Sequence, residues 1–188
     1  MAKTPKAREW RKRNEGLKPL CTTKGAKEGK RQVRFAVAIA HSAGTVICQR
    51  VERGMNGSAY ALFIDTRFDT AIARTVKPRS RRVLQDNCPV QNSAAARRAL
   101  QQINVSSFQI PARSPDLNPI ENLFNQIRAD LQRQAVLCKI VKETEDEFAC
   151  RVEDTFRNWP VQRIDNLVES MPRRIAMIIK SNGQRLKY

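Results

Sequence analysis

Histidine and long apolar runs are what this 188-residue chain has least of, and both shortages exclude classes of protein. The single His41 cannot form a histidine-based metal site, nor an acid–base relay by itself. The longest purely apolar run, Phe35 to Ala40, is far shorter than the roughly 20 residues that cross a bilayer, so no membrane partner is expected. The five cysteines are scattered and include no C-x-x-C, which favours reduced thiols over disulfides or zinc.

Acidic side chains are also few, because 18 Asp and Glu face 35 Lys and Arg and leave a formal net charge of +17. A charge of this size and sign indicates a polyanion partner, since each neutralised phosphate releases condensed counterions. Residues 1–34 are the most basic and have few apolar side chains, so we expect residues 1–30 to be partly disordered. The alternative is a solvated basic surface without a partner.

The pattern of apolar residues and turn signals predicts alternating strands and helices. Residues 35–40 and 45–51 are typical of a β-hairpin, with a turn around His41. Ser58 is a candidate N-cap for a helix through about Val76. Further elements are expected at 82–85 (strand), 93–103 (helix), 106–110 (strand), from 119 onward (helix) and from Thr144 onward (helices). The sequence therefore predicts an α/β protein of one domain with additional helices.

Two carboxylates occupy the ends of two of these elements. Asp86 ends the strand 82–85, and Glu121 lies in the first turn of a helix that Asn118 caps and Pro119 opens. A strand end and a helix start can meet at one edge of a sheet. Carboxylates there, with only oxygen ligands nearby, suit a hard cation such as Mg²⁺ or Mn²⁺. This pattern is the outline of a phosphoryl-transfer site, and no small-molecule substrate is expected.

A simpler interpretation stands beside this one. Asn118 and Glu121 also satisfy a capping box, and Asp86 with Asn87 is ordinary turn chemistry. Two further acids, Asp65 and Asp69, lie on the predicted helix, where a solvated or salt-bridged face is expected for them.

The string Ser114-Pro-Asp-Leu-Asn-Pro-Ile-Glu-Asn-Leu-Phe124, with Gln85-Asp86-Asn87 upstream, resembles the signature of Tc/mariner-type DNA transposases. Asp86 and Glu121 match the second and third acids of the Asp-Asp-Glu branch, because 34 residues separate them (121 − 86 − 1 = 34). Weaker supporting pieces are Trp10-Arg11-Lys12, Gly54 to Gly57 followed by Tyr60, and Ser170 to Ile175.

The resemblance implies a cut-and-paste DNA transposition system of a transposable element, with DNA integration in the nucleus. It implies an RNase H-like mixed sheet flanked by helices, without its first strand and with a C-terminal helical extension. The expected domains are a basic segment 1–30, a transposase core 31–135, and C-terminal helices 136–188 packed on the core. Asp86 and Glu121 are expected to bind Mg²⁺ or Mn²⁺, and transposon ends of double-stranded DNA are the implied partner, with a homodimer as a further expectation.

Basic residues near these motifs are the candidate contacts to nucleic acid. The loop 77–82 leads directly into the strand that Asp86 ends, and Arg113 lies in the signature region. The complete set of predicted DNA contacts is Arg11, Lys12, Lys77, Arg79, Arg81, Arg82 and Arg113.

The chain departs from the family pattern in two respects. Gln91 occupies the position after Gln85-Asp86-Asn87 where the family usually carries histidine. The family's first catalytic Asp lies before the Trp10 segment, and no Asp precedes Trp10 here; the helix-turn-helix region is also absent. We therefore expect little or no metal binding and no activity from the chain alone. The alternatives are a transposon-derived, non-catalytic nucleic-acid-binding module and a gene fragment without function.

Overall fold

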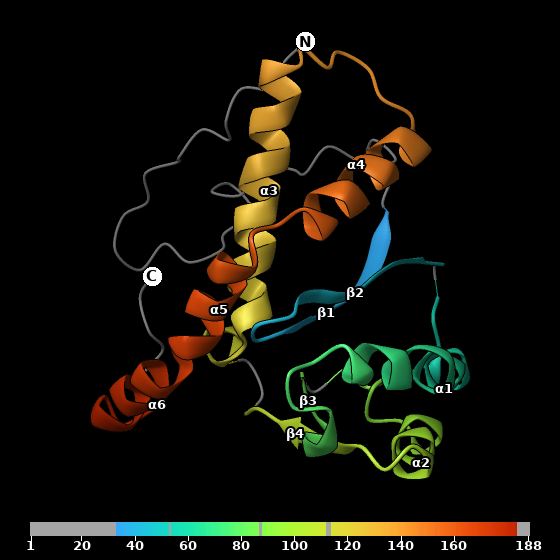
Figure 1. The fold of residues 1–188 in the computed structure, drawn as a ribbon, viewed down its shortest axis with the longest axis vertical. Helices are drawn as coiled ribbons and strands as arrows, with labels where there is room; N and C mark the ends of the chain where they lie inside the picture. The colour runs from blue at the N-terminus through green and yellow to red at the C-terminus, as the bar shows by residue number, and fades with distance from the viewer. Residues whose placement is uncertain (1–32, 53, 87, 112–113, 184–188) are drawn as a thin grey trace, which may run out of the picture.

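The computed structural model describes residues 33–183 except 53, 87 and 112–113 (Figure 1). The predicted basic segment 1–30 and the Trp10 strand lie outside the described residues. The elements are β1 (Arg34–Ala40), β2 (Gly44–Val51), α1 (Gly57–Ala73), η2 (Pro78–Ser80), β3 (Arg82–Gln85), α2 (Ala94–Gln102), β4 (Ser106–Gln109), η3 (Pro115–Leu117), α3 (Pro119–Leu137), α4 (Glu145–Arg157), α5 (Val161–Glu169) and α6 (Met171–Lys180). The α/β class agrees with the prediction.

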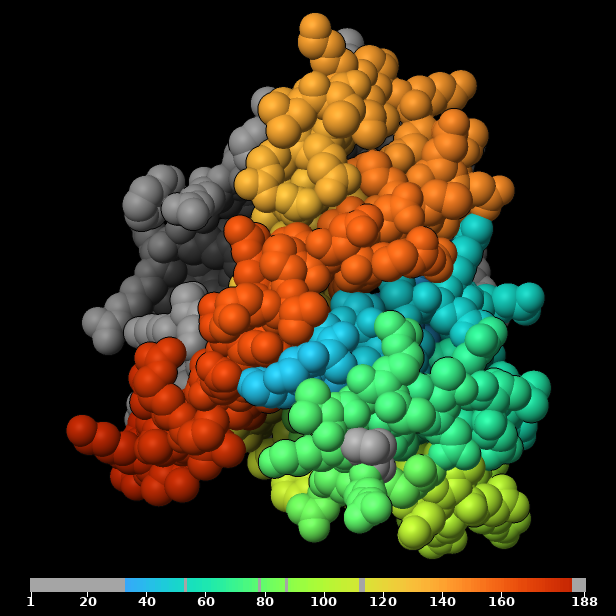
Figure 2. All heavy atoms as spheres, viewed as in Figure 1, coloured from blue at the N-terminus to red at the C-terminus, as the bar shows by residue number. Residues whose placement is uncertain are grey.

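The predicted hairpin forms the middle layer of the molecule. β1 and β2 pair antiparallel, and side chains alternate between the two faces of the hairpin. Ala36 and Ala38 pack on the side of α1 and α2, whereas Phe35, Val37 and Ile39 pack on the side of α3, α4 and α5. Figures 1 and 2 show the hairpin between these two groups of helices. Because both faces are covered, the hairpin consists almost entirely of apolar residues at its centre.

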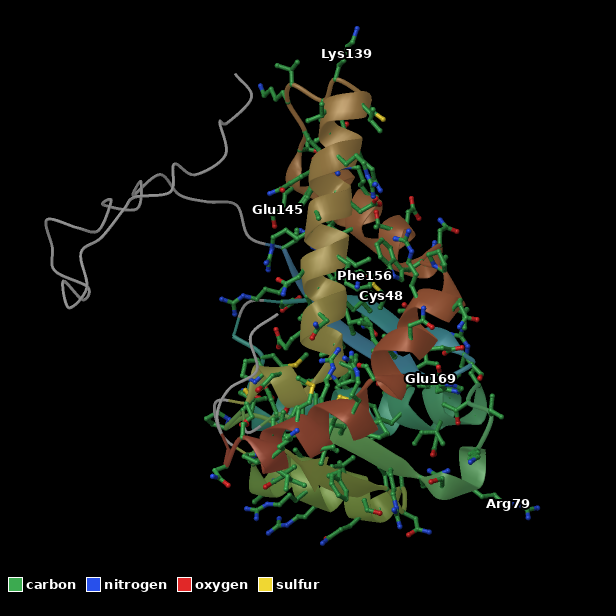
Figure 3. The ribbon with its side chains drawn as sticks, turned by 90° about the vertical axis from the view of Figure 1, so that its left-hand side faces the viewer. Cys48, Arg79, Lys139, Glu145, Phe156 and Glu169 are labelled. Carbon is green, nitrogen blue, oxygen red and sulfur yellow. The ribbon has the colours of Figure 1, made fainter. Side chains whose placement is uncertain are left out.

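Each face of the hairpin has its own apolar core. The first core consists of Ile47, Tyr60, Phe63, Ile64, Phe68, Ala71, Ala96, Ala99, Leu100 and Val105. The second core consists of Leu123, Ile127, Val152, Phe156, Trp159, Ile164 and Leu167. Figure 3 shows Cys48 of β2 next to Phe156 of α4, in the second core. Leu123 and Ile127 of α3 thus place the apolar face of this helix in the second core.

The remaining strands form a second, smaller sheet. β3 and β4 pair in parallel from Arg82 and Ser106 to Gln85 and Gln109. Val83 packs against the first core, as Ala36 and Ala38 of β1 do, so both sheets contact the same core. One mixed sheet was the expectation, but the described strands form two sheets of two strands each. A single sheet would need a strand that pairs with β1 on one side and β3 on the other, and no strand among the described residues does so.

The starts of α3 and α4 follow the local capping signals, whereas the start of α1 differs from the prediction. Asn118 caps α3 through a bond from the Ile120 N–H (3.3 Å), and Thr144 forms the predicted capping box with Glu147. The predicted cap Ser58 is wrong, because Asn56 accepts the Ala59 N–H at 2.9 Å and α1 begins at Gly57. Asn is at least as good an N-cap as Ser, so the earlier residue begins the helix. In the described part of the chain, no helix is long and apolar enough to cross a membrane.

A buried arginine fastens the last helix. Arg174 of α6 has 3% of its surface exposed. Its Nε donates to the Ser170 hydroxyl (2.8 Å), and its Nη1 donates to the Asp116 carbonyl (3.1 Å) and to Asn122 Oδ1 (3.0 Å). Asp116 lies in η3 and Asn122 in the first turns of α3. Since Ile175, Met177 and Ile179 on the same helix are exposed, these polar contacts are the main attachment of α6 to the start of α3.

Gly57 begins α1 where no larger residue fits. A Cβ at Gly57 would lie 2.5 Å from Ser93 Oγ and 2.6 Å from Ser93 Cβ. Ser93 caps α2 by accepting the Ala96 N–H. We expect Gly57→Ala to displace this cap and to lower the free energy of unfolding by about 1–2 kcal/mol, as measured by urea denaturation. The neighbouring exposed Ser58→Ala is the control, with a change within about 0.5 kcal/mol; equal effects of the two would contradict the explanation.

Candidate active site

Asp86 lies at the exposed end of β3. Its Oδ1 accepts the Cys88 N–H at 3.3 Å, which is the turn contact that the simpler interpretation predicts. The Gln91 amide, assigned with its nitrogen towards Asp86, donates to the Asp86 main-chain carbonyl (2.9 Å) and to the same Oδ1 (2.5 Å). Oδ2 has no hydrogen-bond partner among the described residues. The described residues therefore hold one carboxylate oxygen of Asp86, Oδ1, through two hydrogen bonds.

A row of hydrogen-bonded polar side chains lies beside this strand end, and two of its members, Gln85 and Tyr60, are buried. The Ser107 hydroxyl of β4 donates to Gln85 Oε1 (3.2 Å), and the Gln85 amide donates to the Tyr60 hydroxyl (2.5 Å). Burial and then the negative charge of Asp86 raise the pKa of Tyr60 to about 12, although the bond from Gln85 acts in the opposite direction. Tyr60 is therefore a neutral phenol near Asp86 at physiological pH. The site residues predicted from the sequence do not include Gln85. The signal for it was its position two residues after Val83, which places both side chains on the face of β3 that packs on the core.

Glu121 lies in the first turn of α3, as predicted, and is half-buried. The capping-box alternative is not what the structure shows, because the Asn118 N–H donates to the Pro115 carbonyl at 3.2 Å. Within the described residues, the Glu121 carboxylate has no hydrogen bond or ion pair. The Glu121 carboxylate thus lies at the N-terminus of α3.

The two acids match a divalent cation in the type of their donor atoms. Asp86 and Glu121 supply only oxygen atoms, which is what Mg²⁺ and Mn²⁺ prefer. Across residues 33–183, without the gaps, no three His, Cys, Asp or Glu side chains gather in a group that could hold a metal ion. That Asp86 and Glu121 face each other stays a prediction. The donor chemistry fits, but the described residues do not complete a site.

The predicted DNA contacts fall into three groups. Lys77, Arg79 and Arg82 are exposed on the segment that leads into β3. Arg81 binds other residues of the protein, because its guanidinium donates to the Ile103 carbonyl (3.0 and 2.6 Å) and forms an ion pair with Asp69. This ion pair agrees with the solvated or salt-bridged role predicted for Asp69. The other three predicted contacts, Arg11, Lys12 and Arg113, lie outside the described residues.

Comparison with known proteins places the chain in a family. Residues 3–140 of the chain match the DDE superfamily endonuclease family. The chain belongs to this family. The match covers both Asp86 and Glu121, together with the loop that carries the exposed basic residues.

Transposases of nematodes are among the curated relatives of this chain. It is 36% identical over 104 residues to the transposable element Tc1 transposase of Caenorhabditis elegans, covering 55% of this chain and 36% of the relative. It is 27% identical over 140 residues to the Tc3 transposase of the same organism, covering 74% and 41%. The chain therefore spans well under half the length of these curated relatives.

Solved structures show that the chain has the fold of a mariner transposase catalytic domain. The catalytic domain of Mos1 mariner transposase superposes with a TM-score of 0.65 at 16% identity, covering 83% of this chain and 82% of that one. The Mos1 paired-end complex with the left transposon end gives a TM-score of 0.70 at 18% identity, covering 96% and 52%. The predicted RNase H-like fold is thereby confirmed.

Proposed function

We propose that this chain is the part of a Tc/mariner-type transposase catalytic domain that carries the second and third acids, in a cut-and-paste transposition system. The observation that carries the proposal is that the family match, residues 3–140, includes both acids on rigid elements, Asp86 directly after β3 and Glu121 in the first turn of α3. Carboxylate oxygens are the ligands that Mg²⁺ and Mn²⁺ prefer, so two acids in these places favour a role towards a divalent cation.

Asp86 and Glu121 would hold Mg²⁺ or Mn²⁺, one carboxylate to each ion. A bound divalent cation supplies Lewis-acid chemistry to a phosphate oxygen. The chain's own part is to present the two carboxylates from rigid elements, Asp86 after β3 and Glu121 at the start of α3. Glu121 is fixed there by the Asn118 cap. Solved Mos1 catalytic domains with Mg and with Mn, both in complex with Raltegravir, support the choice of these metals.

Double-stranded DNA, and transposon ends in particular, is the proposed partner. Lys77, Arg79 and Arg82 are exposed immediately before Asp86, so a phosphate backbone bound by them would pass close to that carboxylate. The proposal extends to the nucleus as the location and to a homodimer as the assembly. Its support is the likeness to Mos1 structures described as paired-end and strand transfer complexes.

A non-catalytic nucleic-acid-binding module is the second candidate function. The observation that favours it is the lack of a three-acid group in the part of the chain that the structure describes. Mg²⁺ binds weakly to single carboxylates and requires near-octahedral oxygen coordination. Two ions held close together repel each other, so they need a carboxylate that both share. The two candidate functions therefore differ in whether the chain binds metal at all.

We expect the purified chain to bind Mn²⁺ weakly through Asp86 and Glu121 and yet not to nick supercoiled plasmid or a transposon-end duplex. The reason is that removing one member of a catalytic unit usually erases turnover. Water-proton relaxation measures Mn²⁺ binding, and gel electrophoresis in Mg²⁺ or Mn²⁺ measures nicking.

The control is the double variant Asp86→Ala, Glu121→Ala. If its Mn²⁺ binding equals that of the unmodified chain, the metal role of the two acids is wrong and the non-catalytic module is favoured. Metal-dependent nicking by the unmodified chain that disappears in the double variant would show that another group replaces the missing aspartate.

A further inference from the structure

Gln91 makes two contacts with the residue on which the proposed site depends. Its side-chain amide donates to Asp86 Oδ1 at 2.5 Å and to the Asp86 main-chain carbonyl at 2.9 Å. The same side chain therefore bonds both the carboxylate and the backbone of one residue. With the Cys88 N–H on the same Oδ1, the carboxylate cannot rotate without losing two hydrogen bonds.

The turn that carries Gln91 is itself fixed at both ends. The Asn92 N–H donates to the Cys88 carbonyl (3.0 Å), and the Ser93 N–H donates to the Val90 carbonyl (3.3 Å). The Asn92 side chain accepts the Gln109 amide of β4 at 2.6 Å. Gln91 is half-buried between these contacts. The backbone that carries Gln91 is therefore fixed independently of any ligand, which is what a residue that orients another requires.

We propose that Gln91 is a positioning residue that turns Asp86 so that Oδ2 faces the metal; this inference rests on the proposed function. Hydrogen bonds to one oxygen of a ligating carboxylate fix its orientation, and their loss typically costs about 10–100-fold in metal affinity. An uncharged amide is suited to the task because it donates to the carboxylate without adding a positive charge beside the cation. The outcome is a carboxylate with one oxygen bound by protein and one offered outward.

The test has a readout that needs no metal. In a ¹⁵N–¹H spectrum of the full chain, the Gln91 side-chain amide, identified by its disappearance in Gln91→Leu, is expected at a shifted position and to move in Asp86→Ala. The exposed Gln102 on α2 is the internal control, and its amide is expected to stay unchanged. A Gln91 amide at the position of a free amide, unaffected by Asp86→Ala, would overturn the proposal.

Metal affinity is the second readout, with Mn²⁺ alone as the probe. Gln91→Leu is expected to weaken Mn²⁺ binding about tenfold, whereas Gln102→Leu leaves it unchanged. Gln91→His at pH 8, where a neutral imidazole can donate in the same direction, is expected to restore most of the loss. Circular dichroism of each variant separates lost orientation from lost folding, and the His variant serves if the Leu variant does not fold.

The outcomes separate this inference from the proposed function. If Asp86→Ala leaves Mn²⁺ affinity unchanged, the proposed metal role of Asp86 is wrong. If Asp86→Ala removes binding but Gln91→Leu retains it, only the positioning role of Gln91 is wrong. Loss in both, with recovery in Gln91→His, supports both.

Discussion

Binding of the chain to duplex DNA is expected to weaken by about a thousandfold between roughly 50 and 200 mM salt, with little sequence preference. The net charge of +17 provides the attraction. Without Arg81, which is bound to Ile103 and Asp69, the predicted contacts are Arg11, Lys12, Lys77, Arg79, Arg82 and Arg113. About six phosphate contacts give a loss of this size, because each contact releases counterions that added salt opposes.

The double variant Arg79→Gln, Arg82→Gln tests where the DNA lies. It is expected to reduce the slope of log affinity against log salt by about 1.8, since each phosphate contact contributes about 0.9. The charge-matched control is Lys139→Gln, Lys142→Gln, with the same slope as the unmodified chain. Figure 3 shows Lys139 at the far end of the molecule from Arg79. Fluorescence anisotropy measures the DNA affinity of both variants. Equal salt slopes in the two would mean that the loop before β3 does not contact DNA.

Arg174→Ala is expected to lower the free energy of unfolding by about 3 kcal/mol. The substitution leaves the Asp116 carbonyl, the Asn122 side-chain oxygen and the Ser170 hydroxyl without the donor that now serves them. Removing the donor from a buried acceptor costs about 1–3 kcal/mol, and less from the half-buried Asn122 and Ser170, so about 3 kcal/mol in total is expected. Because Asn122 follows Glu121 directly, the start of α3 should loosen together with α6.

Urea denaturation followed by circular dichroism measures the effect. The control is Arg173→Ala, one residue earlier on the same exposed helix, for which a change within about 0.5 kcal/mol is expected. Similar losses in both variants would mean that helix propensity or charge, rather than the buried contacts, determines the stability of α6.

Local signals in the sequence predicted the framework of the fold. The hairpin of β1 and β2, the Asn118 cap before Pro119 and the Thr144 capping box all depend on residues close in the chain. These contacts are local, so short patterns identify them. The same locality misled at Ser58, because two good capping residues, Asn56 and Ser58, stand two positions apart and only the structure distinguishes them.

Contacts between distant residues could not be predicted in this way. Arg174 bonds Asp116 across 58 positions and Asn122 across 52, and in the sequence it looks like any other basic residue. Arg81 resembled a phosphate contact, but the structure binds it to the Ile103 carbonyl, 22 positions away. The positions of Asp86 and Glu121 on their elements followed from the sequence, whereas the partners of Asp86 required the fold.

The two separate sheets have a consequence for how copies of this protein behave together. Within the described residues, β1 and β3 each pair with one strand only. A strand edge that stays unpaired presents a row of backbone N–H and C=O groups. Such edges are templates for pairing between molecules, which leads to aggregation. Mutual repulsion of chains that each carry +17 opposes that encounter. Salt or bound DNA weakens this repulsion. The charge that attracts a polyanion therefore also keeps the unbound protein from aggregating at low salt.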